Sequence, residues 1–286
     1  MTERADGRPP ARAGITATRT VLHGKVPEGE YYAARAGDSP YLPGTLLTAG
    51  TALPRPVPAW TFPELPEEPV IPFDYEVLHL DEQLIVIDKP HFLPTTSNGR
   101  IVRETVQTRL RREFGEEVTP LHRLDRLTAG VVVCSRRRET RGAYQSLFQE
   151  RAVGRRYVAH TTAPLAEPRW REIAVPMRKD PGGREVRVDP RGTRTLTRLR
   201  GTGTRVELEP VTGHTHQLRV LLNHLGAPII GDDVYPRDRG LALYDFRVPL
   251  QLLATEVWFV DPLNGREHTF ISSRSLNGNV GEISVN

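Results

Sequence analysis

Short apolar segments with the two-residue period of β-strands dominate the chain from about residue 74 onward. Residues 76–80 (EVLHL) and 84–88 (LIVID) are separated by three polar residues, which predicts an antiparallel β-hairpin. Residues 130–134 (GVVVC) form a run of apolar and β-branched side chains that is typical of a buried strand. Further strands bounded by proline or glycine are expected at RRYVAH (155–160), EIAVP (172–176), EVRVD (185–189), TRVELEP (204–210) and EVWFV (256–260).

Helical periodicity occurs in three segments. Within residues 101–114, apolar side chains recur every four positions and arginines occupy another face, so an amphipathic helix is expected. Residues 139–150 predict a second helix, and a third is expected to begin at Thr215 as its N-cap and to bury a stripe of leucines. Strands outnumber helices and seldom alternate with them. This pattern favours an α+β fold, with a mixed, largely antiparallel central sheet and flanking helices, over a doubly wound parallel sheet.

The chain is expected to contain three regions. Residues 1–70 are rich in proline, glycine and alanine, and their prolines interrupt any helix or central strand, so they predict an extension or linker. Residues 71–273 carry the regular patterning and are expected to form the main domain. Residues 274–286 lack clear periodicity and are expected to form a loose tail.

The composition is that of a folded globular protein, since 38% of the 286 residues are hydrophobic and 26% are charged. The longest purely apolar runs, such as residues 84–87, contain four residues, whereas a membrane span needs about 20. The amino-terminal segment is polar and lacks the apolar centre of a secretory signal, so a cytoplasmic location is expected. The single cysteine, Cys134, has no second cysteine with which to form a disulfide.

Charge is segregated along the chain although the net charge is only +4. Residues 97–160 carry 14 arginines and seven acidic residues, whereas residues 61–90 carry eight acidic residues and one lysine. A basic block of this size favours a polyanionic partner such as a nucleic acid. Arginine-rich codon usage and a solvated basic helix face are the alternatives.

The most unusual segment is HRLDRLTAGVVVCS (residues 122–135). Its single carboxylate, Asp125, lies between Arg123 and Arg126 and shortly before an apolar strand. Neighbouring cations favour the ionised form of a carboxylate, which suits a nucleophile or an electrostatic stabiliser better than a proton donor. A structural ion pair at the entry to the strand is the alternative.

A second candidate segment covers residues 208–236, which predict a strand, a tight turn, a helix and a loop. Arg219 falls in the first turn of this helix, where a cation could meet a carboxylate or a phosphate. His214, His216 and His224 could instead suggest a metal site, but no carboxylate or cysteine lies at a familiar ligand spacing, so no metal is expected. Because the sequence contains neither a glycine-rich phosphate loop nor a GxSxG motif, nucleotide hydrolysis and serine-type acyl transfer are not expected either.

Over roughly residues 74–272 the chain resembles the RluA-type RNA pseudouridine synthases. The segment from His122 to Gly130 resembles the family's HRLDxxTSG motif, with Ala129 in place of the serine. Residues 84–94 (LIVIDKPHFLP) are similar to the family's strand followed by Lys-Pro.

The same resemblance extends to the second candidate segment. Residues 212–220 (TGHTHQLRV) are similar to the family's TGRTHQIRV, with His214 replacing an arginine. Leu221 stands where the family often has histidine, and residues 226–235 (GAPIIGDDVY) match the family's GDxxY ending. Neither departure affects the aspartate or arginine of these motifs.

The resemblance implies the pseudouridine synthase fold, a central active-site cleft and conversion of a uridine in ribosomal RNA, or alternatively transfer RNA, to pseudouridine. It implies no cofactor and no metal. By similarity, Asp125 is the catalytic aspartate, Arg219 holds it ionised and oriented, and Tyr157 stacks on the base and assists removal of the C5 proton. The expected substrate-binding residues are His122, Arg123, Arg126, Thr128, Leu218, Lys89 and His214.

RNA is therefore the expected partner, and a monomer is the expected state. Some family members carry a small S4-type RNA-binding module ahead of the catalytic domain, so residues 1–70 are either an extension or a degenerate module of that kind. An RNA-binding or assembly protein of the same fold without catalysis is the main alternative function. A nucleoside hydrolase is a weaker alternative, because no second carboxylate accompanies Asp125 in its motif.

Overall fold

The computed structural model describes residues 5–97 and 99–276, which are divided between two compact units. The smaller unit comprises Met1–Glu68, Ser97–Arg103 and Gln107–Glu116. The larger unit comprises Pro69–Thr96, Glu104–Val106 and Glu117–Asn286. Each unit is described by itself below.

The smaller unit contains a four-stranded antiparallel sheet in the order β1-β4-β2-β3, together with most of helix α1. The bounds are Thr18–Leu22 (β1), Tyr31–Ala33 (β2), Leu46–Leu47 (β3), Val57–Thr61 (β4) and Val106–Phe114 (α1). Leu22, Val26 and Val57 are among the apolar side chains buried against this sheet. The expectation of an extension or linker missed these strands because they are short: most of the prolines lie outside them, and Pro58 is accommodated within β4, opposite Val21 of β1.

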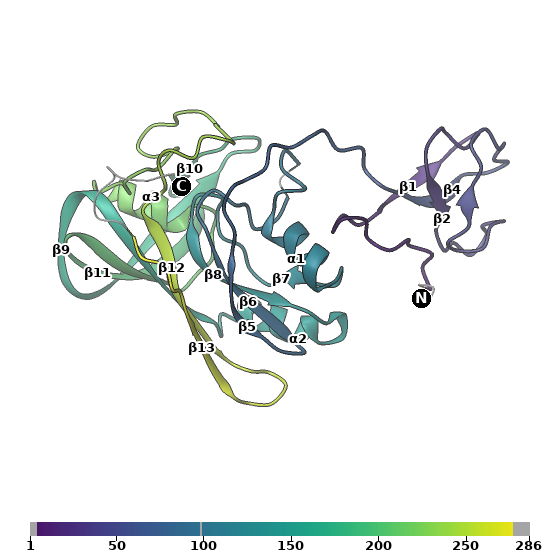
Figure 1. Cartoon of the computed structure of the whole chain (residues 1–286). Helices are drawn as coiled ribbons and strands as arrows, with labels where there is room; N and C mark the ends of the chain where they lie inside the picture. Colours follow the sequence, from purple (N-terminus) through teal and green to yellow (C-terminus); the bar gives the residue numbers. More distant parts are fainter. Residues whose placement is uncertain (1–4, 98, 277–286) are drawn as a thin grey trace. The chain divides into compact units, whose positions relative to one another are not determined.

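The larger unit is built on a nine-stranded sheet (Figure 1). Its strands are β5 (Glu76–Leu80), β6 (Leu84–Lys89), β7 (Thr119–Pro120), β8 (Ala129–Ser135), β9 (Gly154–Lys179), β10 (Val186–Val188), β11 (Thr193–Pro210), β12 (Leu252–Val260) and β13 (Glu267–Ile271). Its main path runs β10-β9-β12-β8-β6-β5, while β11 pairs with β9, β13 with β12 and β7 with β8. Helix α2 (Arg138–Gln149) packs near β8, and α3 (Gln217–His224) packs near β9, β10 and β11.

Strands β6 and β8 are neighbouring interior strands of this sheet, and every residue in both is buried. They pair antiparallel, and the predicted hairpin of β5 and β6 is confirmed. Strand β8 also makes a short parallel pair with β12, while the other ladders of the sheet are antiparallel. The predicted α+β class with a mixed, largely antiparallel sheet is therefore confirmed.

Several predicted elements have different limits in the structure. The strands expected at 155–160 and 172–176 belong to one 26-residue strand, β9, which pairs along its length with β11. The helix expected at 101–114 begins only at Val106. Among the residues with described positions, no helix is long and apolar enough to cross a membrane.

The residues at the start of the expected carboxy-terminal tail are bonded to the sheet. Arg274, where the loose tail is expected to begin, lies 3.3 Å from Asp88 through its Nε atom, and Ser272 and Ser273 donate hydrogen bonds to the same carboxylate. Residues 277–286 of that expected tail lie outside the described residues.

A substitution at Gly130 tests the close approach of β8 and β12. Gly130 has φ +115°, and an added Cβ would lie 2.1 Å from the carbonyl oxygen of Ala254. Gly130→Ala should lower the free energy of unfolding by more than about 3 kcal/mol, since it combines backbone strain with overpacking. Urea denaturation measures this, with Gly142→Ala as the control: Gly142 is exposed in α2 with open space at its Cβ position, so alanine should stabilise by about 0.5–1 kcal/mol. Equal effects of the two substitutions would contradict the argument.

Candidate active site

A cavity of about 680 Å³ opens in the larger unit beside α3. Among the residues described as lining it, Asp125 is the only acidic one. The basic side chains of its lining, apart from histidines, are Arg123, Arg151, Arg155, Lys179, Arg194 and Arg219. A lone carboxylate among so many cations distinguishes this cavity from an ordinary surface cleft.

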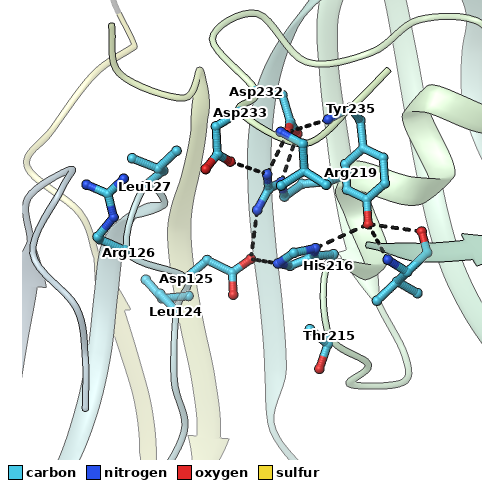
Figure 2. Close-up of polar contacts among 12 residues, drawn as sticks. Leu124, Asp125, Arg126, Leu127, Thr215, His216, Arg219, Asp232, Asp233 and Tyr235 are labelled. Atoms are coloured by element: carbon cyan, nitrogen blue, oxygen red, sulfur yellow. Dashed lines mark hydrogen bonds and ion pairs between the residues drawn. The ribbon is translucent and has the colours of Figure 1, made fainter. Parts of the chain in front are cut away.

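Asp125 lies in the loop between β7 and β8, at the edge of the cavity. The amide of Thr128 donates a hydrogen bond to the Asp125 carbonyl, which closes a turn and directs the chain into β8. The Asp125 side chain is 29% exposed, and its Oδ2 atom lies 3.5 Å from Nη1 of Arg219 and 3.8 Å from Nε2 of His216 (Figure 2). The carboxylate is therefore held at one oxygen and still accessible.

Arg219 is buried in the first turn of α3 and is held mainly by Asp232. Its Nε donates to Oδ2 of Asp232 at 2.8 Å, and its Nη2 donates to Oδ1 at 2.5 Å, forming a bidentate pair. Nη2 also donates to Asp233 at 2.7 Å. Burial opposes the charge of Arg219, but the hydrogen bond and charge of Asp232, with Asp125 and Asp233 adding to them, raise the pKa of Arg219 above its ordinary value.

Asp232 can remain buried because its acceptors are used by several donors. Besides Arg219, the backbone amides of Val234 and Tyr235 donate to its Oδ1 atom at 2.8 and 2.9 Å. Its side chain is 0% exposed, so these bonds replace the water that the carboxylate loses on folding. The result is a guanidinium with a fixed orientation whose remaining nitrogen, Nη1, faces Asp125 (Figure 2).

His216 is the N-cap residue of α3, in place of the predicted Thr215, and it has a left-handed φ of 56°. Its Nδ1 lies 3.2 Å from the hydroxyl of Tyr235. The same hydroxyl also accepts the amide of Val186 and donates to its carbonyl, so Tyr235 connects His216 to β10. Burial lowers the pKa of His216, although Asp125 opposes this shift, so Asp125 receives its positive partner from Arg219.

Tyr157 lies in β9 between Leu208 of β11 and Ala254 of β12, and its ring lines the cavity. It is 7% exposed. Burial raises the pKa of Tyr157, the charge of Arg155 opposes the rise and Asp125 adds to it. At neutral pH the side chain is therefore a protonated phenol.

Most of the residues expected to form the site line this one cavity. They are Asp125, Tyr157, Arg219, His122, Arg123, Thr128, Leu218 and His214. Arg123 is exposed, whereas Thr128 and Leu218 are buried. No group of three or more His, Cys, Asp or Glu side chains placed to hold a metal ion occurs in the described part of the chain.

Lys89 and Arg126 are not in the lining of the cavity. The Lys89 ammonium is fully buried and donates to the carbonyls of Pro90, Leu93 and Arg126, and burial lowers its pKa well below the ordinary value. The Arg126 guanidinium donates to the carbonyls of Leu243 and Ala242 and lies on the far side of Asp125 from Arg219 (Figure 2). The cation beside Asp125 therefore comes from α3 and not from its arginine neighbours in the sequence.

Sequence reasoning missed the residues that hold Arg219. Asp232, Asp233 and Tyr235 belong to the GDDVY segment, which matched a family motif but received no role in the site. The signal available was the consecutive pair of aspartates after a helix with a buried arginine. Only the fold places them 2.5–2.8 Å from that guanidinium.

Truncation of Asp232 tests the anchoring of Arg219. Asp232→Ala leaves a buried guanidinium without its bidentate partner, so the free energy of unfolding should fall by about 3–5 kcal/mol. Guanidinium denaturation measures the loss. Asp245→Ala is the matched control, because its partner Arg247 is 85% exposed, and its denaturation midpoint should not move. A similar loss of stability in both variants would mean that the buried Arg219–Asp232 pair contributes no more to folding than an exposed pair.

The pH dependence of stability tests the environment of His122. Its Nε2 accepts the amide of Val133, its ring stacks on Phe148, and burial, aided by the charge of Arg155, lowers its pKa to about 3. The unfolded chain takes up a proton near the ordinary pKa of about 6.5, and the folded chain does not, so stability should fall as the pH drops from about 6.5 towards 3. Denaturation at a series of pH values should show a shallower decline for His122→Phe; parallel curves would contradict the assignment.

Comparisons with known proteins identify the family of the chain. A family model described as RNA pseudouridylate synthase matches residues 83–224. The dual-specificity RNA pseudouridine synthase RluA of Haemophilus influenzae is 31% identical over 204 residues, which cover 68% of this chain and 91% of that protein. Human pseudouridylate synthase RPUSD2 is 33% identical over 177 residues, which cover 59% of this chain.

The lengths of these relatives differ. The chain covers 32% of human RPUSD2 and 39% of the mitochondrial tRNA pseudouridine(32) synthase of Saccharomyces cerevisiae, so it spans about a third of the length of such relatives. The solved structure of human RNA pseudouridylate synthase domain containing 1 has a TM-score of 0.58 at 22% identity, covering 73% of this chain and 86% of that chain, and supports the fold. With most of the length of a bacterial RluA matched and the HRLD aspartate paired to the arginine of α3, the chain belongs to the RluA-type family of RNA pseudouridine synthases.

Proposed function

We propose that this protein isomerises a specific uridine in RNA to pseudouridine, with ribosomal RNA as the first candidate substrate and transfer RNA as the second. The observation that carries the proposal is the single carboxylate of the cavity, Asp125, beside the fixed guanidinium of Arg219. The family relationship supplies the reaction class, since the RluA and tRNA pseudouridine(32) synthase relatives are named for this activity.

Asp125 is the group that acts on the ribose. The reaction breaks the bond between N1 and C1′, joins C1′ to C5 after the uracil has turned, moves the C5 proton away and leaves N1 protonated, so no atoms are gained or lost. One ionised carboxylate serves either route through this cleavage, by adding to or stabilising an electron-poor C1′ or by removing a ribose proton. Arg219 orients the carboxylate from 3.5 Å without burying it.

Tyr157 and Leu218 hold the uracil while it turns. Both side chains are buried and line the cavity beside Asp125, so they form an apolar pocket that excludes water from the cleaved intermediate. The raised pKa of Tyr157 keeps its phenol protonated. The phenol can therefore accept the C5 proton only if it gives up its own proton at the same time. Asp125 is the acidic group of the described lining that can take the proton instead.

RNA is the partner that the charge of the cavity fits. Arg123, Arg151 and Arg155 line the cavity, together with Lys179 at the end of β9 and Arg194 at the start of β11. These cations attract phosphates, so binding should weaken as salt rises. A uridine inside an RNA helix must be flipped out to reach Asp125. We propose that Arg123 fills the space that the flipped base leaves in the base stack.

We further place the activity in the cytoplasm, in a monomer that uses neither cofactor nor metal. Pseudouridine mapping by carbodiimide labelling and primer extension, on total RNA from cells with and without the gene, tests the proposal. Loss of one site identifies the substrate. If no site is lost, purified protein incubated with unmodified ribosomal and transfer RNA transcripts decides between catalysis and RNA binding without catalysis.

Replacement of the carboxylate tests the role of Asp125. Asp125→Asn keeps the size of the side chain but removes its charge, so turnover on an unmodified transcript should fall at least about 10³-fold while RNA affinity changes little. Asp245→Asn, at a half-buried position outside the cavity lining, is the control and should retain the parent rate. Turnover by Asp125→Asn near the parent rate would show that another group acts on the ribose.

A further inference from the structure

The backbone that carries Asp125 is fully hydrogen-bonded at its carbonyl oxygens. In the loop Leu124–Leu127, the Asp125 carbonyl accepts the amide of Thr128. The other carbonyls of the loop, at Leu124, Arg126 and Leu127, accept hydrogen bonds from side chains of one short segment, residues 89–95. Each of the four carbonyls of this loop therefore accepts a hydrogen bond from the protein itself, although the loop adjoins the cavity.

Thr95 makes the closest contact to the peptide that precedes Asp125. Its Oγ1 donates to the Leu124 carbonyl at 2.9 Å and accepts the Leu124 amide at 3.1 Å. One hydroxyl therefore binds both polar groups of Leu124, as a neighbouring strand would do. Thr95 is 2% exposed, so water cannot easily replace it.

His91 and Lys89 hold the residues that follow Asp125. Nδ1 of His91 lies 2.7 Å from the Leu127 carbonyl, which fixes the proton on Nδ1, and burial lowers the pKa of His91 to about 4, so the ring is neutral at pH 7. Nζ of Lys89 lies 3.3 Å from the Arg126 carbonyl. The loop is thereby bonded on both sides of its catalytic aspartate.

The segment 89–95 is itself fixed in an unfavourable backbone conformation. Phe92 has φ +69°, which bulky residues rarely adopt, yet it is only 3% exposed. Its ring packs against Phe73 and Phe246, with centroids 5.5 Å away in both cases. Strain of this kind persists only where surrounding contacts over-determine the conformation, and it is concentrated near functional sites.

From these contacts we propose that Thr95 and His91 are positioning residues for the catalytic carboxylate, setting the place of Asp125 through the backbone of Leu124 and Leu127. The proposal rests on the proposed function. Arg219 restrains only the end of the Asp125 side chain, at 3.5 Å, so the distance between carboxylate and C1′ is set by where the loop holds the Cα atom. A displacement of about 1 Å at a reacting group can cost about 100-fold in rate.

A merely structural role would look different from a positioning role. Loss of a buried hydroxyl anywhere in the larger unit lowers stability, but only a loss beside Asp125 should change the chemical step. Thr161 offers the matched control: it is 0% exposed, its Oγ1 lies 2.8 Å from the carbonyl oxygen of Ala163 and 3.1 Å from that of Thr204, and it lies outside the cavity lining.

The test compares Thr95→Val, Thr95→Ser and Thr161→Val in the full chain. On an unmodified transcript containing the mapped uridine, Thr95→Val should lower kcat about 10- to 100-fold with the Kd for RNA unchanged, while Thr95→Ser, which keeps the hydroxyl, should restore the parent kcat. Thr161→Val should lower the melting temperature without lowering kcat. A parent-like kcat in folded Thr95→Val, or an equal loss in Thr161→Val, would overturn the proposal.

Hydrogen exchange supplies a readout that does not depend on turnover. The Leu124 amide should exchange faster in Thr95→Val and remain protected in Thr95→Ser. If the parent itself makes no pseudouridine, the proposed function fails, and unchanged protection at Leu124 would separately show that Thr95 does not hold the loop. If Thr95→Val does not fold, His91→Phe and His91→Asn replace it: Asn retains a donor for the Leu127 carbonyl, so only Phe should lower kcat, and equal kcat values in the two would overturn the proposal.

Discussion

The buried ion pair between Arg219 and Asp232 is the interaction on which the site depends. A guanidinium that is 3% exposed can exist only with partners that replace its hydration, and Asp232 supplies two of its hydrogen bonds. The backbone amides of Val234 and Tyr235 in turn satisfy Asp232, so the loop after α3 is shaped around this one carboxylate. Because three of its donor contacts are used in this way, Arg219 has a fixed orientation when it faces Asp125.

Asp125 is restrained from two directions that differ in kind. α3 holds its side chain through a charge, whereas residues 89–95 hold its backbone through hydrogen bonds to carbonyl oxygens. The first restraint weakens only slowly with distance, and the second is short and directional. Together they allow a carboxylate that is 29% exposed to be accessible to a substrate and yet well placed.

The sequence predicts the elements whose pattern is local. It does not predict the arrangements that depend on contacts between residues far apart in the chain. The hairpin at 76–88, the buried strand at 129–135 and the aspartate of the HRLD motif follow from periodicity and from a motif. The partner of Asp125 does not: Arg123 and Arg126 are adjacent in the chain, but a turn sends Arg126 to the carbonyls of another loop, and the contact comes from Arg219, 94 positions away. Likewise, the strands among the first 70 residues are stabilised by the packing of buried apolar side chains, which no local sequence pattern predicts.

The distances around Arg219 show how its positive charge is divided among three carboxylates. Arg219 approaches Asp232 and Asp233 at 2.5–2.8 Å but Asp125 only at 3.5 Å, so most of its positive charge is already shared with two other carboxylates. A closer contact would reduce the nucleophilicity of the Asp125 carboxylate and tie it to the guanidinium. The two aspartates of the GDDVY segment therefore do more than anchor an arginine, because they share its charge and leave the Asp125 carboxylate oriented and 29% exposed at the cavity.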